Sequence, residues 1–144
     1  MQMTLPLWVL LGFAGWTLLL LFSTVGVYRW SRILTGRATV REWNSSEPQG
    51  SGWYQRAMKA HMNCVENLPV YGAVAVAILA TGARGPALDV LAVCVLAARI
   101  VQSLIHIIPE QTETVAIFRF VFYFTQIVCM FAMGILVVLH ATSA

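Results

Sequence analysis

The sequence carries little charge. Of its 144 residues, 10% are charged and 59% are hydrophobic. A soluble domain carries about 25% charged residues, so this chain is too apolar for an ordinary water-facing surface. The net charge of +3 is no signature of nucleic-acid binding, because most of the positive charge lies in one polar segment. The composition therefore indicates a membrane protein, and its length fits one domain.

Cysteine is also scarce. Cys64, Cys94 and Cys129 all lie in apolar segments, and no two of them share a CxxC spacing. Such cysteines pack as small hydrophobic side chains. The pattern indicates neither a disulfide framework nor a metal site.

Long apolar runs are what the sequence does contain. Four of them are long enough for a helix to cross a bilayer, which takes about 20 residues. We expect transmembrane helices over residues 4–28, 56–80, 87–107 and 114–140, within a single domain of residues 1–144. The first run lacks a basic n-region and a small-residue cleavage site, so we expect a retained helix and not a signal peptide. The predicted fold is an all-α bundle of four transmembrane helices.

One polar connection, residues 29–55, separates the first two predicted helices. It contains the loop-forming run NSSEPQGSG. This segment and its flanks carry most of the basic residues: Arg29, Arg32, Arg37, Arg41, Arg56 and Lys59. Connections rich in Lys and Arg face the cytoplasm. We therefore expect a multi-pass protein with both termini on the non-cytoplasmic side, in the inner membrane if the cell is bacterial.

Polar side chains also occur inside the predicted spans, where they are costly and mark functional-site candidates. Residues three or four apart share one face of a helix. Such faces hold Arg56, Lys59, Asn63, Glu66 and Asn67 on the second helix, Arg99, Gln102 and His106 on the third, and Arg119, Tyr123 and Gln126 on the fourth. All three faces fall in the cytoplasmic half, with Arg29 at the same level. We expect them to meet in one polar cavity.

This cavity would contain several cations and one clear acid, Glu66. Arginine binds carboxylates in a bidentate manner, and Glu66 can accept an ammonium group. The pattern favours a ligand with more negative than positive charge. Two structural alternatives stay open: Glu66 pairs with Arg99 or Lys59 to hold the bundle together, and Arg56 and Lys59 extend to lipid headgroups.

The segment RAMKAHMNCVENLPVY, residues 56–71, resembles the signature of the MAPEG family, the membrane-associated proteins of eicosanoid and glutathione metabolism. The match consists of a basic residue followed by Ala60-His61, Asn63, Glu66 and Pro69. The resemblance implies a homotrimer of four-helix bundles that binds glutathione, as co-substrate, between neighbouring subunits near the cytoplasmic side. It also implies contact with membrane lipid and with a lipophilic second substrate.

The resemblance further implies roles for individual residues. Glutathione would be bound by Arg29, Lys59, Asn63, Glu66, Arg99, Gln102 and His106. Among these, Glu66 would hold the γ-glutamyl ammonium, and Asn63 would hydrogen-bond the peptide. Arg119 would stabilise the thiolate and Tyr123 would donate a hydrogen bond, which makes them the catalytic candidates. The implied function is a glutathione-dependent transferase or peroxidase acting on lipophilic electrophiles.

Two other functions compete with this one. Four spans and a membrane glutamate also suit a small multidrug exporter, although such exporters often carry their carboxylate in the first helix, where this chain has none. A non-catalytic family member that binds a lipid or a partner protein would keep the fold without thiol-dependent turnover. The chain also departs from the family pattern, with Met62 where several members have arginine and His106 where tyrosine is common.

Overall fold

The structure, a computed structural model, describes residues 3–43 and 50–143 and contains only helices within these ranges. In chain order these are α1 (Leu5–Leu20), the π-helical turn η1 (Leu21–Gly26), α2 (Val27–Leu34), the 3₁₀ turn η2 (Val40–Glu42), α3 (Gly52–Thr81), α4 (Pro86–Ile107) and α5 (Glu113–Ser143). The prediction of an all-α fold with long apolar helices is confirmed.

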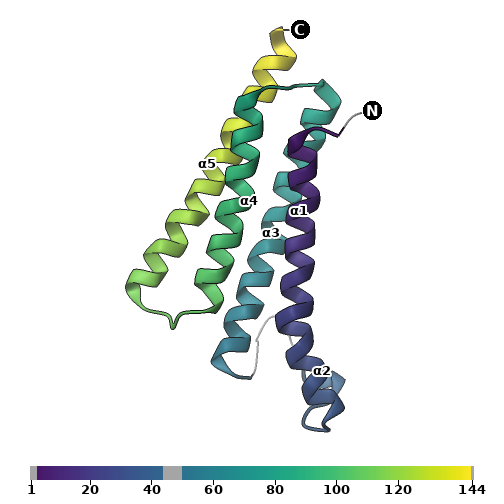
Figure 1. The fold of residues 1–144 in the computed structure, drawn as a ribbon, viewed down its shortest axis with the longest axis vertical. Coiled ribbons are helices and arrows are strands. Elements are labelled where there is room, and N and C mark those ends of the chain that lie inside the picture. Colours follow the sequence, from purple (N-terminus) through teal and green to yellow (C-terminus); the bar gives the residue numbers. More distant parts are fainter. Residues whose placement is uncertain (1–2, 44–49, 144) are drawn as a thin grey trace.

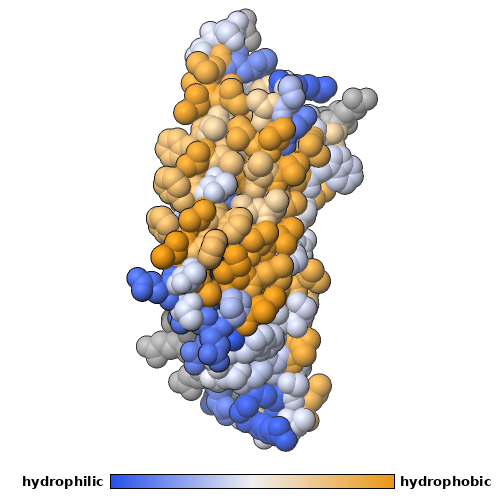
Figure 2. Space-filling view, turned by 60° about the vertical axis from the view of Figure 1, so that its left-hand side comes forward, coloured by the Kyte–Doolittle hydropathy of each residue, from blue (hydrophilic) through white to orange (hydrophobic). Residues whose placement is uncertain are grey.

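Four helical stretches are long and apolar enough to cross a membrane: Leu5–Leu34, Gly52–Thr81, Pro86–Ile107 and Glu113–Ser143. Figure 2 shows a broad hydrophobic band across one face of the molecule, with hydrophilic side chains gathered at its lower end and a smaller number near its top. A surface of this kind matches the apolar interior of a bilayer, since lipid tails cannot hydrogen-bond to polar groups. The chain is an integral, multi-pass membrane protein.

All four helical stretches extend beyond their predicted bounds, and α5 ends at Ser143 and not at residue 140. The first helical stretch continues past residue 28 to Leu34, through the π-helical turn. The next helix begins at Gly52 and not at residue 56, because the Ser51 hydroxyl caps it by accepting a 3.3 Å hydrogen bond from the Tyr54 backbone N–H. The connection between them is correspondingly shorter.

The helices form a bundle in which α3 and α4 lie between α1 and α5 (Figure 1). Both ends of the chain lie at one end of the bundle, and the long connection between α2 and α3 lies at the other. Phe13, Tyr71, Val95 and Met133 are fully buried where the helices meet. The Tyr71 hydroxyl donates a 3.0 Å hydrogen bond to the Pro6 carbonyl, which ties α3 to the start of α1.

A second, smaller cluster lies at the end of the bundle with the long connection. Val25, Tyr54 and Met58 are buried there against Tyr28 and Trp43. The rings of Tyr28 and Tyr54 stack with their centroids 4.3 Å apart. These aromatic contacts hold the start of the connection against α3.

The two short connections have ordinary turn chemistry. Gly82 ends α3 with a φ of 68°, a left-handed conformation that glycine adopts without a steric penalty. Pro86 begins α4 at a position where a missing N–H costs nothing. Ahead of α5, the Thr112 hydroxyl accepts a 3.3 Å hydrogen bond from the Val115 N–H. Both connections are therefore tight enough to set α3, α4 and α5 side by side.

Loss of the buried bond between α3 and α1 should weaken the bundle. We expect Tyr71→Phe to lower the free energy of unfolding by about 1 kcal/mol, the value typical of hydrogen bonds between membrane helices. Unfolding would be followed by circular dichroism as a denaturing detergent is titrated into micelles. Tyr123→Phe is the matched control, because no described residue hydrogen-bonds to its hydroxyl. Equal stability of both variants would contradict the assignment.

Candidate functional site

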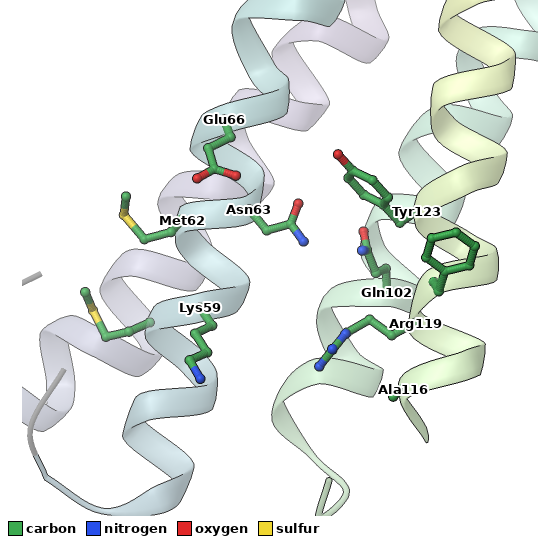
Figure 3. Close-up of a pocket in the computed structure, with 10 residues that line it drawn as sticks. Lys59, Met62, Asn63, Glu66, Gln102, Ala116, Arg119 and Tyr123 are labelled. Atoms are coloured by element: carbon green, nitrogen blue, oxygen red, sulfur yellow. The ribbon is translucent and has the colours of Figure 1, made fainter. Parts of the chain in front are cut away.

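A groove of about 440 Å³ opens between α3 and α5, in the half of the bundle nearest the long connection (Figure 3). Polar side chains from three helices reach it. Its lining consists of Met58, Lys59, Met62, Asn63, Glu66, Gln102, Ala116, Arg119, Phe120 and Tyr123. The volume lies within the range of about 300–1,000 Å³ that is usual for small-molecule sites.

Helical spacing explains why these residues share one groove. On α3, Lys59, Asn63 and Glu66 are separated by four and three residues, so they project from one face. On α5, Arg119 and Tyr123 are four residues apart and face α3 across the groove. Four predicted glutathione-binding residues and both predicted catalytic residues therefore lie around a common space.

Charge is divided along the groove. Lys59 and Arg119 lie toward the end near the connections, whereas Glu66 and Tyr123 lie toward the middle of the bundle (Figure 3). The Arg119 guanidinium donates a 2.6 Å hydrogen bond to the Gln111 side-chain oxygen, which holds it at the mouth of the groove. Glu66 is exposed to the groove and makes no ion pair with the described residues. The structural alternative required Glu66 to pair with Arg99 or Lys59. Among the described residues, Glu66 pairs with neither of them.

Arg99 lies behind the groove and does not line it. Its side chain is 1% exposed. Nη1 donates to Asn63 Oδ1 at 3.1 Å and to Gln102 Oε1 at 3.0 Å. Its guanidinium carbon lies 5.4 Å from the centroid of the Phe13 ring, whereas Nε and Nη2 are buried without a partner among the described residues. Arg99 therefore supports two groove residues from within the bundle.

The hydrogen bonds continue from these two residues to further amides. Gln126 is fully buried, and its Nε2 donates to Gln102 Oε1 at 3.0 Å. Asn67 Nδ2 donates to Asn63 Oδ1 at 3.0 Å. We call these residues the amide network: Asn63, Asn67, Arg99, Gln102 and Gln126. The network joins α3, α4 and α5 at the level of the groove.

Two other predicted ligand-binding residues lie outside the groove lining. Arg29 Nε donates a 2.7 Å hydrogen bond to the Tyr54 hydroxyl, and its guanidinium carbon lies 5.4 Å from the centroid of the Trp43 ring. His106 is 7% exposed, and its Nδ1 is buried without a partner among the described residues. Contacts of Arg29, Arg99 and His106 with a ligand stay predictions.

Arg56, which shares the polar face of α3, has a structural contact. Its Nε donates a 3.1 Å hydrogen bond to the Ile107 carbonyl at the end of α4. Carbonyls in the last turn of a helix have no partner within that helix, and a cation there also offsets the helix dipole. Arg56 thus stabilises a helix end beside the groove.

Four lining residues were not predicted: Met58, Met62, Ala116 and Phe120. Three of them lie one turn from a polar lining residue, because Met62 is three residues after Lys59, Ala116 three before Arg119 and Phe120 three before Tyr123. Met58 is instead next to Lys59. The helical spacing that grouped the polar residues would have identified the first three. Their apolar character concealed them in a chain where most residues are apolar.

The described residues contain no group of three or more His, Cys, Asp or Glu side chains that could hold a metal ion. Cys64, Cys94 and Cys129 are all free thiols. The groove residues themselves offer ammonium, guanidinium, amide, phenol and one carboxylate group. Such a set suits an anionic organic ligand that also carries one positive charge.

Fold and groove together define the class: a four-span membrane protein with a charged intramembrane groove. The model of the MAPEG family matches residues 6–139, nearly the whole chain, so the protein belongs to the MAPEG family. This confirms the resemblance seen in the sequence. No curated protein and no solved structure gives a significant match to the chain.

The contact between Arg29 and Tyr54 should restrain the first connection. Hydrogen bonds to charged groups contribute about 1.5–3 kcal/mol, so we expect Tyr54→Phe to speed tryptic cleavage after Arg37 or Arg41 by about tenfold or more. The measurement is the rate of limited proteolysis of detergent-purified protein, followed by mass spectrometry. Ser31→Ala, an exposed change on α2, should leave the rate unchanged. Equal rates for the two variants would show that the bond does not restrain this segment.

Proposed function

We propose that this protein is a membrane-bound, glutathione-dependent transferase or peroxidase for lipophilic electrophiles, with glutathione bound in the groove between α3 and α5. One observation carries the proposal: Lys59 and Arg119 lie at one end of a groove whose acid, Glu66, lies toward the other. The charges of glutathione, two carboxylates and one ammonium at neutral pH, complement this arrangement.

The dimensions support the same ligand. Lys59 and Glu66 are seven residues apart on α3, which is a rise of about 10 Å along a helix. An extended tripeptide spans about 10 Å as well. Glutathione can therefore place its ammonium at Glu66 and its glycine carboxylate near Lys59. Asn63 lies between them, opposite the middle of the peptide.

The proposed chemistry is activation of the glutathione thiol. A thiol with a pKa of about 8.5 is mostly protonated at neutral pH. A nearby guanidinium favours the thiolate, which is the nucleophilic form. Arg119 is the candidate for this role, and the Tyr123 hydroxyl is a candidate hydrogen-bond donor to the sulfur. In the transferase reaction the thiol proton passes to water, sulfur bonds to the electrophilic carbon, and the leaving group departs with its electron pair.

The second substrate would enter from the lipid. The groove combines its polar groups with Met62 and Phe120, both of which have exposed side chains. An apolar electrophile dissolved in the bilayer would reach the sulfur across this apolar rim. We propose that the groove opens on the cytoplasmic side, where glutathione is available, and that a homotrimer encloses it between subunits.

Neutralising the acid of the groove should weaken glutathione binding. We expect Glu66→Gln to raise the Kd for glutathione about tenfold or more, because a hydrogen bond to a charged group is worth about 1.5–3 kcal/mol. Isothermal titration calorimetry on purified protein measures this directly. Asp89→Asn, which removes an acid at the opposite end of the bundle, is the matched control. Absence of binding by the parent protein would remove the transferase proposal.

Replacing the proposed thiolate partner should affect chemistry more than binding. With glutathione at saturation, Arg119→Leu should abolish the ultraviolet absorbance of the bound thiolate and lower kcat by about 10²-fold, as loss of one anion-stabilising donor does. The assay is conjugation of chlorodinitrobenzene. Arg84→Leu removes a basic residue from the far end and should change neither quantity. A thiolate signal that survives in Arg119→Leu would assign the role to another residue.

A further inference from the structure

Arg99 determines which way the side-chain amides of the amide network are oriented. A guanidinium group has hydrogen-bond donors and no acceptor. Asn63 and Gln102 each bond to Arg99 Nη1, so both must turn their side-chain oxygens toward it. The opposite orientation would bring N–H groups against a cation inside the bundle. Arg99 therefore fixes which end of each amide faces inward.

A second donor reinforces each orientation. Asn63 Oδ1 also accepts from Asn67 Nδ2 at 3.0 Å, and Gln102 Oε1 also accepts from Gln126 Nε2 at 3.0 Å. The amide of Gln126 is itself held, because its Nε2 also donates to the Phe122 carbonyl at 2.9 Å. Rotating Gln126 would place its oxygen against two other oxygens.

The amide nitrogens of Asn63 and Gln102 are thereby left for the groove. Neither nitrogen hydrogen-bonds to the described residues, and neither is among their fully buried polar atoms without a partner. Both residues line the groove. Together with Lys59 and Arg119, they give its wall four groups that can only donate where they face the ligand.

We propose that Arg99 and Gln126 are positioning residues that lock Asn63 and Gln102 as hydrogen-bond donors, so that the groove selects the carbonyl and carboxylate oxygens of its ligand. This inference rests on the proposed function, since it names the peptide oxygens of glutathione as the groups that are read. Gln126 is the new element in it. It touches no ligand, and its effect reaches the groove only through Gln102.

A purely structural role for Gln126 would be to hold α5 against α4. Such a role predicts a loss of stability that is independent of Gln102. Positioning predicts instead that the effect of Gln126 on binding disappears once Gln102 can no longer donate. A double-mutant cycle separates the two, because it measures the coupling between two residues directly.

The test measures the Kd for reduced glutathione by calorimetry in the parent protein, Gln126→Met, Gln102→Leu and the double variant. We expect Gln126→Met, which keeps the volume and removes the hydrogen bond, to raise Kd about three- to tenfold. Gln102→Leu should raise Kd at least as much, and the double variant should be no worse than Gln102→Leu alone. Met133→Leu, a volume-conserving change at another fully buried site of α5, should leave Kd unchanged. Thermal unfolding of every variant is recorded in the same detergent.

Each outcome decides the matter. Kd values that follow this pattern support the inference. If the parent protein binds glutathione and Gln126→Met binds it equally well, the positioning role is overturned and the proposed function stands. If the rise in Kd of the double variant equals the product of the two single rises, the two residues act independently. That result would assign Gln126 a structural role and overturn the inference. No binding by the parent protein overturns the proposed function and, with it, this inference.

Discussion

The bundle is organised around a single buried cation. Arg99 comes from α4, stacks over Phe13 of α1, donates to Asn63 of α3 and reaches α5 through Gln102. An arginine in the middle of a membrane helix costs about 2.5–3.5 kcal/mol on insertion scales. Part of that cost is offset by the polar partners of Nη1, Asn63 and Gln102, and these partners fix how α3, α4 and α5 face one another. The groove depends on this arrangement, because Asn63 and Gln102, which accept hydrogen bonds from Arg99, also form its inner wall.

The electrostatic character of the groove follows from the same cation. Lys59 and Arg119 contribute positive charge from the lining, and Arg99 contributes it from behind, where the low dielectric weakens it less than water would. Glu66 is the one acid in the lining and has no cationic partner within the described ranges. An anionic ligand with one ammonium group would satisfy both the excess positive charge and the unpaired carboxylate.

Hydropathy was sufficient to predict the four spans, because nothing but a helix satisfies the backbone of a long apolar run in lipid. Helical spacing was sufficient to place Lys59, Asn63, Glu66, Arg119 and Tyr123 in one region. The depth of each side chain within the bundle could not be predicted in the same way. Spacing puts Arg99 and Gln102 on one face of α4, but only the packing shows that one supports the groove while the other lines it.

The ends of the helices were the other limit of the sequence. The run after residue 28 contains Arg29, Arg32 and several polar residues, so it resembles a loop in composition, yet it is helical to Leu34. Contacts made far along the chain decide this, since Tyr28 and Arg29 pack against Tyr54 at the start of α3. Interactions between distant segments are not visible in the local composition.

The π-helical turn at Leu21–Gly26 divides the first span into two segments with different angular phase. Its hydrogen bonds close over one residue more than those of an α-helix, and each residue turns the helix by about 100°. The face that α2 presents to the bundle is therefore offset by about 100° from the one that an uninterrupted α-helix would give it. A chain with one residue fewer in this turn could keep the same lipid-facing surface on α1, yet it would carry Arg29 around to a different side of the bundle. The length of one turn thus sets where the end of the first span nearest the long connection directs its charge.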